Sequence, residues 1–588
     1  MRVIARVYSD YVRRSWPLLA IAVLLVVCET VMNVYMPQLS KAMVDAAVGT
    51  DGVEAASRVL LWKSLVYTVL GLIRSVVIFF EIYLFERVAE NVSLNVRHDL
   101  YDKVQNLSFA FHNRSRTGDL MSRMTSDVYA VRDMCGFGVS MLAYDVFIIV
   151  SVVGWMIAYN PVYALASLFS MPLLAVFAIR YSGRSGPVFR SIQDQVASMT
   201  AAVQESVSGI RVVKAFAQED QERDRFGKAN DAVLRDNLKA AKINAFYHPA
   251  MDFCASLGTV GVIWCGGRLY AQGALTAGDI TAFLSYLWML IWPVRQIAAI
   301  IRIAQRGIAG GQRVFEILDA RDQIANRSDA EQIAEVAGHV QFCDVDFSYD
   351  SEEKVLDGFS LDIPPGSTVG ILGTTGSGKS TIGALIPRFH DVDSGAILID
   401  GKDIRDLDIH SLRRQVGIVP QDTFLFSTSI RENIAYYQPD IELERVIAAA
   451  KAAQIHDFIE SLPQGYDTVV GERGVGLSGG QRQRVAIARA LVMDPKILIL
   501  DDSTASVDAE TESMIQESLR EIAKGRTTII ISQKVSSVRY ADRIVVLRNG
   551  KIIEQGTHAE LYALGGFYRQ LCDAQAMPLQ PAREGVEI

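Results

Sequence analysis

The chain has 588 residues, several times the roughly 150 residues of a typical domain, so a single small globule is excluded. Half of the residues are hydrophobic and 21% are charged, which excludes an intrinsically disordered protein. Residues 1–330 carry a net charge of +5 and residues 331–588 a net charge of −13, which indicates two parts in different surroundings. The acidic second half argues against nucleic acid as a partner. The six scattered cysteines argue against a disulfide framework or a zinc site.

The first half contains six apolar runs of about 20 residues, each long enough to cross a bilayer as a helix. They lie at 16–36, 59–80, 139–158, 162–181, 246–267 and 280–300. The first run is long enough to stay in the bilayer, so we interpret it as a span rather than a removable signal. An even number of spans places both termini on one side of the membrane.

Basic residues before the first span indicate which side that is. They are Arg2, Arg6, Arg13 and Arg14, whereas the short connections on the opposite side carry only Arg58. By the positive-inside rule, the N-terminus is cytoplasmic. We therefore predict a multi-pass protein of the cell membrane, with the lipid bilayer as its surroundings and with both termini and the second half in the cytoplasm.

The two remaining connections, 81–138 and 182–245, are long and charged but keep apolar residues at helical spacing. They predict helices that continue well out of the membrane. Short interruptions at Phe111–Gly118 and Gly209–Asp220 are suited to crosswise segments that face the cytosol. Ordinary loops are the alternative.

Ionisable residues also occur within the predicted spans, and four of them are of interest: Glu29, Arg74, Asp145 and Asp252. Such residues are costly in a membrane and are candidates for contact with a transported molecule, although pairing between helices or snorkelling explains them equally. The sixth span carries Phe283, Tyr286, Trp288 and Trp292. These aromatic residues suit either a bulky amphipathic cargo or ordinary packing.

From Val340 onward the pattern changes to short β-rich runs alternating with helical segments, which predicts an α/β domain with a largely parallel sheet. The runs are Thr368–Leu372, Ile397–Ile399, Ile497–Leu500 and Thr527–Ile531. The first run leads into a glycine-rich motif that opens a helical segment, which is the context of a phosphate-binding P-loop. Its predicted nucleotide-binding residues are Gly373, Thr374, Thr375, Gly376, Ser377, Gly378, Lys379 and Ser380, with Thr381 next to them.

Each of these residues has a physical task in phosphate binding. The glycines let backbone N–H groups wrap the phosphates, Lys379 reaches the β- and γ-phosphates, and the Ser380 hydroxyl is a ligand for Mg²⁺. The strand Ile497–Leu500 delivers Asp501, the acid expected to hold the same ion, with Asp502 directly after it. About twenty residues earlier, Leu477–Gln481 reads Leu-Ser-Gly-Gly-Gln ahead of a helix, an arrangement suited to a γ-phosphate.

With these motifs the chain resembles an ABC exporter half-transporter, in which six membrane helices are fused to one ATP-binding cassette. The resemblance covers about residues 10–575. It implies a membrane α-helical domain with cytoplasmic extensions at 1–320, a linker at 321–339, an α/β P-loop NTPase cassette at 340–575 and a flexible tail at 576–588. ATP and Mg²⁺ are the implied cofactors.

The resemblance also implies roles for further residues. Tyr349 is similar to the aromatic residue that stacks on adenine, Gln421 to the Q-loop glutamine, which also approaches Mg²⁺, and Asp508 to the end of the D-loop. The signature that contacts the nucleotide of a facing cassette is matched by Ser478, Gly479, Gly480 and Gln481. Phe111–Gly118 and Ser208–Glu219 resemble the two coupling-helix regions, and Leu275–Asp279 the start of the sixth span.

Two positions depart from the family pattern. A glutamate that polarises the attacking water normally follows Asp501, where this chain has Asp502, and the switch histidine is replaced by Gln533. The aspartate is one methylene shorter, and the glutamine cannot become cationic. With Asp502 and Gln533 at these two catalytic positions, the nucleotide site of this chain is expected to bind ATP but to cleave it poorly.

The resulting prediction is one subunit of a heterodimeric exporter of amphipathic compounds, similar to the degenerate-site member of bacterial multidrug exporters. The expected partner is a second half-transporter with the glutamate and the histidine, whose site this chain's signature completes. The alternatives are a homodimeric lipid or peptide exporter and an ATP-sensing regulator that does not transport.

Overall fold

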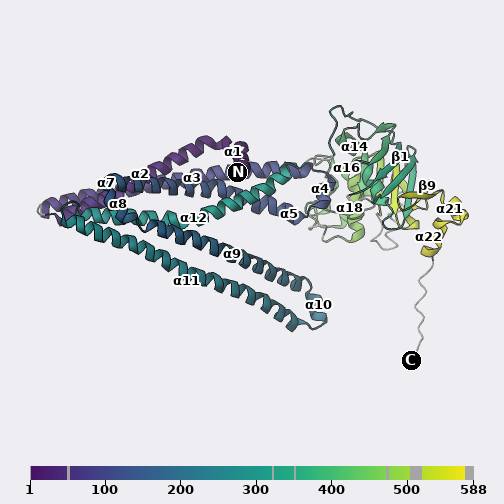
Figure 1. Cartoon of the computed structure of the whole chain (residues 1–588). Coiled ribbons are helices and arrows are strands. Elements are labelled where there is room, and N and C mark those ends of the chain that lie inside the picture. The colour runs from purple at the N-terminus through teal and green to yellow at the C-terminus, as the bar shows by residue number, and fades with distance from the viewer. Residues whose placement is uncertain are drawn as a thin grey trace, which may run out of the picture. The chain divides into compact units, whose positions relative to one another are not determined.

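The computed structural model describes residues 2–49, 53–320, 324–349, 353–471, 474, 476–502 and 520–576 (Figure 1). The predicted D-loop residue Asp508 and residues 577–588 of the predicted tail lie outside the described residues. The chain forms two compact units. One contains Met1–Asn106 and Ser115–Ala320, and the other contains Leu107–Arg114 and Arg321–Ile588.

The first unit is helical throughout its described part. Its helices are α1 (Arg2–Asp10), η1 (Val12–Ser15), α2 (Trp16–Val48), α3 (Val53–Asn106), α5 (Thr117–Ser122), η2 (Arg123–Asp127), α6 (Val128–Asp133), η3 (Met134–Gly138), α7 (Val139–Tyr159), α8 (Pro161–Leu168), α9 (Met171–Ser208), α10 (Ile210–Ala215), α11 (Glu219–Ala271) and α12 (Ala277–Leu318). Within the described ranges, six helical stretches are long and apolar enough to cross a membrane, as the sequence predicts.

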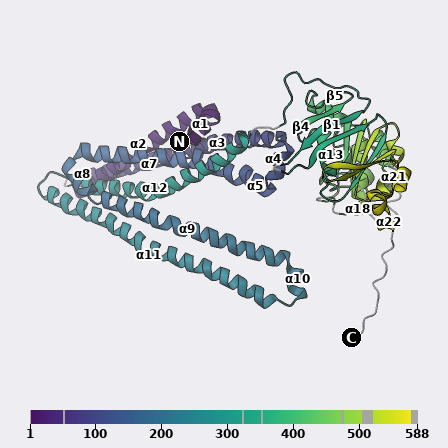
Figure 2. The same ribbon diagram turned by 45° about the vertical axis from the view of Figure 1, so that its right-hand side comes forward.

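The predicted extensions of the spans are also helical. Helix α3 continues without a break to Asn106, and α9 and α11 run side by side to a tip formed by α10 (Figures 1 and 2). Charged residues cover much of these extensions, whereas the spans are almost entirely apolar. The fold class predicted from hydropathy and helical spacing is therefore confirmed for this unit.

Aromatic side chains form the core of the membrane unit where α8, α11 and α12 meet. The ring of Tyr163 stacks on Phe283 with centroids 4.1 Å apart, and both residues are buried. The hydroxyl of Tyr286 donates a hydrogen bond of 2.8 Å to the carbonyl oxygen of Val34. Two of the four aromatic residues of the predicted sixth span are thus packing residues. Trp288 and Trp292 remain 62% and 64% exposed.

The ionisable residues of the predicted spans are mostly paired. Arg74 of α3 donates to Glu29 of α2 at 3.0 Å, and Arg295 of α12 pairs with Asp252 of α11. Asp145 is buried, and its Oδ2 atom finds no hydrogen-bond donor among the described residues. Pairing between helices thus accounts for three of the four residues without invoking a transported molecule.

The second unit contains two sheets with helices around them. Its strands are β1 (Val340–Phe347), β2 (Leu356–Ile363), β3 (Thr368–Gly373), β4 (Ser394–Ile399), β5 (Lys402–Asp403), β6 (Val416–Val419), β7 (Ile497–Asp501), β8 (Thr527–Ser532), β9 (Arg543–Arg548) and β10 (Lys551–Gly556). Its helices are α4 (Phe109–Arg114), α13 (Lys379–Leu385), α14 (Ile409–Gln415), α15 (Ile430–Ile434), α16 (Leu443–Ala452), α17 (His456–Ser461), η4 (Gly465–Asp467), α18 (Gly479–Leu491), α20 (Val535–Val538), α21 (His558–Leu564) and α22 (Phe567–Ala576).

The larger sheet has the order β10-β9-β3-β8-β7-β6, and its strands are parallel except for the edge strand β10. Strands β3 and β7 are buried along nearly their whole length, which explains why both read as continuous apolar runs. The carboxyl ends of β3, β7 and β8 therefore meet at one edge of the sheet, which is where α/β proteins bind ligands.

One strand prediction needs correction. The run Ile397–Ile399 lies in β4, which belongs to the separate antiparallel sheet β2-β1-β4-β5 and not to the parallel core. Buried and partly exposed residues alternate at the end of β4, as in a sheet with one solvated face. The left-handed pair Asp400 and Gly401 then returns the chain into β5. The short apolar run alone did not distinguish the two sheets.

Helix α4 is part of the second unit although it is flanked in sequence by helices of the first. The ring centroids of its Phe109 and of Phe389 are 4.2 Å apart, and the guanidinium of Arg413 lies 5.2 Å from the centroid of the Phe389 ring. This is the first of the two interruptions that the sequence predicted as cytosolic contact segments. The aromatic contact attaches it to the cassette of its own chain.

Candidate nucleotide-binding site

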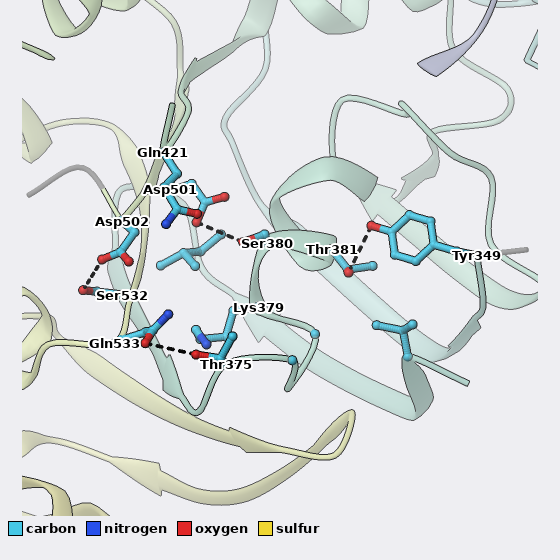
Figure 3. Close-up of a pocket in the computed structure, with 14 residues that line it drawn as sticks. Tyr349, Thr375, Lys379, Ser380, Thr381, Gln421, Asp501, Asp502, Ser532 and Gln533 are labelled. Atoms are coloured by element: carbon cyan, nitrogen blue, oxygen red, sulfur yellow. Dashed lines mark hydrogen bonds between the residues drawn. The ribbon is translucent and has the colours of Figure 1, made fainter. Parts of the chain in front are cut away.

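The glycine-rich loop between β3 and α13 wraps around a cavity of about 390 Å³ (Figure 3). Gly376 and Gly378 have φ angles of +80° and +97°, which side chains with a Cβ atom rarely adopt. At Gly378 a Cβ atom would also lie 3.0 Å from the carbonyl oxygen of Val355, at the start of β2. At Gly376 it would point into open space. The loop therefore needs glycine for its conformation and leaves room for a ligand at its tip.

Lys379 and Ser380, the first two residues of α13, reach this cavity. The ammonium group of Lys379 donates to the carbonyl oxygen of Thr374 at 2.7 Å, so it lies against the loop itself. Burial lowers the pKa of Lys379, and the carboxylates of Asp502 and Asp501 oppose that shift. The Ser380 hydroxyl donates to Asp501 Oδ1 at 3.2 Å. A hydroxyl and a carboxylate in contact are the oxygen ligands that Mg²⁺ prefers.

Asp501 ends β7 in the half-buried floor of the cavity. Burial raises the pKa of its carboxyl group, the Ser380 hydroxyl lowers it, and the neighbouring Asp502 raises it further. A cation at this position would remove the penalty of the buried charge. Gln421, which follows β6 closely, lines the same cavity. These residues therefore fit a divalent cation.

The residues at the two non-consensus positions are held by hydrogen bonds (Figure 3). Asp502 has a φ angle of +41°, and its Oδ1 accepts a bond of 3.1 Å from the hydroxyl of Ser532 at the end of β8. The amide oxygen of Gln533 accepts a bond of 3.3 Å from the Thr375 hydroxyl. Both side chains line the cavity, and each is engaged with a polar neighbour.

Tyr349 lines the cavity on the side away from Asp502, and its hydroxyl lies 3.2 Å from that of Thr381 (Figure 3). Its ring packs edge-on against Phe347 and His390, with centroids 4.8 and 5.3 Å apart, and the residue is 45% exposed. These edge contacts leave a ring that is held in place but partly open. Such a ring is suited to stacking on a flat base.

Ser377 tests whether the loop fits phosphate. The residue is 2% exposed, and its hydroxyl finds no hydrogen-bond partner among the described residues. A buried hydroxyl without a partner costs about 1–3 kcal/mol of stability, and a phosphate oxygen that accepted its hydrogen bond would remove that cost. Ser377 itself does not line the cavity, so the open space at Gly376, which does line it, is the feature that fits the triphosphate of a nucleotide.

The signature residues lie apart from this cavity, at the start of α18. Ser478 caps the helix: its hydroxyl accepts from the Gln481 amide at 3.2 Å, and its own amide donates to the Gln481 side chain at 2.8 Å. This capping box holds Gly479 and Gly480 in the first helical turn. None of the four residues lines the cavity that Lys379 and Asp501 share. This spacing suits a role toward a different nucleotide.

Of the predicted site residues, eleven line one cavity: Tyr349, Thr375, Gly376, Gly378, Lys379, Ser380, Thr381, Gln421, Asp501, Asp502 and Gln533. Gly373, Thr374 and Ser377 do not line it but lie next to these residues in the loop. Three further residues line the cavity that the sequence did not assign to the site, namely Val355, Ile531 and Ser532. Ser532 directly follows the apolar run Thr527–Ile531 at the carboxyl edge of the sheet, and that position was a usable signal.

A matched pair of glycine substitutions tests the loop. Gly376 and Gly401 both have φ +80° and open space at the Cβ position, so alanine strains the backbone equally at both, by about 1–2 kcal/mol. We expect Gly376→Ala to weaken ATP binding about tenfold, the equivalent of about 1.4 kcal/mol, because the methyl group occupies the space left for phosphate. Gly401→Ala is expected to lower thermal stability alone. Calorimetric ATP titration measures the loss of affinity, and thermal unfolding measures the loss of stability. An equal loss of ATP affinity in both variants would contradict the assignment of this loop as the phosphate-binding loop.

Comparison with known proteins agrees with this geometry. Residues 19–294 match the family of ABC transporter transmembrane regions, and residues 356–505 match the ABC transporter family of ATP-binding domains. The chain is 37% identical to the uncharacterized ABC transporter ATP-binding protein YknU of Bacillus subtilis (strain 168) over 97% of both chains. It is 38% identical to the ATP-dependent lipid A-core flippase of Syntrophus aciditrophicus over 88% of this chain and 86% of the flippase.

Two further likenesses concern export. The chain is 36% identical over 97% of its length, and 98% of the relative, to the B. subtilis ATP-binding/permease protein YgaD, whose name refers to multidrug export. It superimposes with a TM-score of 0.81 and 31% identity on a bacterial Atm1-family ABC exporter with ATP bound, covering 97% of this chain and 99% of the other.

Six apolar helices joined to a cassette of this kind define an ABC exporter half-transporter. The chain belongs to the ABC transporter family, and its second unit is an ATP-binding domain, an ATPase coupled to export.

Proposed function

We propose that this chain is one half of a dimeric, ATP-driven exporter, and that its own nucleotide site binds MgATP but hydrolyses it slowly. Tyr349 holds the adenine, the loop from Gly373 to Thr381 holds the phosphates, and Ser380, Gln421 and Asp501 hold Mg²⁺. The observation that carries the slow-site proposal is the pair of non-consensus side chains, Asp502 and Gln533, each in contact with a polar neighbour.

The need for a second half is supported by a difference between the two interruptions of the long helices. Phe109 of α4 packs on Phe389 within the second unit. At the second interruption, Ile210 and Val212 of α10 and Phe216 directly after it are 47%, 62% and 72% exposed. An apolar face of this kind marks an interaction site. We assign it to the cassette of the second half-transporter.

The intact signature supports a heterodimer. Ser478 and Gly480 stand at the start of a well-capped helix, with backbone N–H groups suited to a γ-phosphate. A chain that kept only a weak site of its own would still need this motif if it completes the working site of a partner. We therefore propose a partner chain that carries the glutamate and histidine this chain lacks.

Amphipathic compounds are the proposed cargo. One relative is named for multidrug export and another for flipping a lipid A core. Trp288 and Trp292 present exposed aromatic surface on the sixth span. Bulky molecules with an apolar body match such a surface. Trp288 and Trp292 face either this cargo or lipid.

Reconstitution tests this proposal. The chain is purified with any partner that accompanies it, the partner is identified by mass spectrometry, and the assembly is placed in inside-out vesicles with MgATP and a fluorescent amphipathic dye. We expect ATP-dependent dye accumulation and a partner with the consensus glutamate and histidine.

The alternatives predict different outcomes. A homodimeric exporter of lipids or peptides predicts no second chain and turnover by this chain alone. A regulator that only senses ATP predicts nucleotide-driven closure of the cassettes without accumulation of any cargo. Either result would replace the proposal.

A further inference from the structure

The N-terminal helix α1 is attached to the membrane unit at two points. Near its middle, Arg6 pairs with Asp319 at 2.6 Å, and its guanidinium lies 4.2 Å above the ring of Phe315 at the end of α12. After the helix, the Tyr11 hydroxyl donates to Asp99 of α3 at 2.9 Å. These contacts hold α1 against α12 and α3, so its position is defined by the fold.

Beside α1 lies an apolar cavity of about 310 Å³, within the size range of about 300–1,000 Å³ for ligand pockets. Helices α1, α2, α7 and α12 all contribute to its lining. The lining residues that matter here are Ile4, Tyr8, Leu19, Leu142, Ile303 and Ala304. Ile4, Tyr8 and Leu142 are 43%, 51% and 50% exposed. Because these lining residues are about half exposed, the cavity opens to the surface and can admit a guest molecule from outside.

The cavity lies at one edge of the predicted bilayer. Leu19 is near the start of the first span, Leu142 near the start of the third, and Ile303 just beyond the end of the sixth. These ends belong to the same side of the membrane because alternate spans run in opposite directions. Trp16, at the start of α2, is 60% exposed, as expected for an interfacial anchor. The guest therefore has access from the lipid.

Unpaired positive charge accompanies the cavity. Arg13 and Arg14 follow the lining residue Val12 in the turn between α1 and α2, and Arg2 precedes Ile4. All three are exposed, and they have no acidic partner within the described part of the chain, in contrast to Arg6. Guanidinium groups bind phosphate with two parallel hydrogen bonds, and basic residues beside a span attract anionic lipids.

We propose that this cavity binds one acyl chain of an anionic bilayer phospholipid, whose phosphate is held by Arg13 and Arg14. The site is separate from the nucleotide cavity, and it joins α1 to three spans. Each part of such a lipid has a counterpart at this site: the apolar lining suits the acyl chain, the bilayer edge gives it access, and the guanidinium groups suit the phosphate. The lining itself contains no charged residue that would favour a charged ligand.

The test uses the full-length protein in nanodiscs with equal amounts of phosphatidylglycerol and phosphatidylcholine, followed by mild detergent extraction and native mass spectrometry of retained lipid. We expect the unmodified protein to retain phosphatidylglycerol. Leu142→Trp, which fills the cavity, is expected to reduce that retention about tenfold. The control Val146→Trp places the same side chain one turn away on α7, at a residue that is also 50% exposed and does not line the cavity.

Charge variants test the headgroup site. Arg13→Gln with Arg14→Gln is expected to abolish the preference for phosphatidylglycerol, whereas Arg13→Lys with Arg14→Lys keeps most of it, and Arg58→Gln at the opposite membrane edge changes nothing. If Leu142→Trp does not fold, Ala304→Leu takes its place. Equal lipid retention by the Leu142 and Val146 variants would overturn the proposal. So would a change of oligomeric state in Leu142→Trp at unchanged lipid retention, which would indicate a second copy as the occupant.

Discussion

The ATPase activity of the purified full-length chain is expected to rise about 100-fold when Asp502→Glu and Gln533→His are combined. Glutamate extends the carboxylate by a further methylene, about 1.5 Å, and displacements of about 1 Å at a reacting centre can cost about 100-fold in rate. Histidine restores a group that can carry positive charge near the γ-phosphate. It also replaces the amide oxygen that now accepts from Thr375. The measurement is phosphate release at saturating MgATP.

Two controls accompany this experiment. Adding Lys379→Ala to the double variant should abolish the gained activity, which excludes a contaminating ATPase. Each single variant should recover only part of the gain, because attack of water and stabilisation of the developing charge act together. Full-rate turnover by the unmodified chain on its own would show that its site is competent, and the proposed division of labour would then be wrong.

The second large effect is expected from Ser478→Ala in the assembled pair, where ATP hydrolysis should fall by about 100-fold or more. The variant removes a hydroxyl donor and also the cap that holds the start of α18. Loss of one such donor to a transition state typically costs about 10²–10³-fold in rate. In the proposed heterodimer the affected site is the one built on the partner's P-loop, so ATP binding to this chain's own cavity should be unchanged.

Thr557→Ala is the matched control for the signature variant. Thr557 caps α21 with the same reciprocal bonds to Glu560, away from any predicted nucleotide contact. Each substitution loses one cap, worth about 1 kcal/mol, so their effects on thermal stability should be similar. Hydrolysis should fall only in the Ser478 variant. A parallel loss of activity in both would mean that helix stability, and not phosphate contact, explains the effect.

The proposed slow hydrolysis in this chain's own site has an expected consequence for the transport cycle. In the proposed heterodimer, we expect ATP that is bound and not cleaved to keep the two cassettes associated, and cleavage in the other site to separate them in part. The equilibrium between two conformations would then be set mainly by the working site. The exposed apolar face of α10 is where we expect this motion to enter the membrane unit from the partner's cassette.

Patterns over short stretches of sequence predicted the membrane spans and most of the nucleotide-binding motifs. Six spans follow from apolar composition over about 20 residues, since a bilayer core demands that length of helix. The P-loop and the signature are recognised from residues adjacent in sequence, because each presents neighbouring backbone groups, and Asp501 is recognised because it directly follows an apolar strand. Such features need no knowledge of what packs against them.

Only the tertiary structure decided which distant residues meet. The run Ile397–Ile399 is a good strand in either sheet, and its pairing with β1 placed it in the antiparallel one. The pairing of Glu29 with Arg74, and the bond from Ser532 to Asp502, join segments that no local pattern connects. The apolar cavity beside α1 likewise exists because helices from separate parts of the sequence converge there. Hydropathy and motif spacing report on each segment alone, whereas contacts between segments depend on the packing of the whole unit.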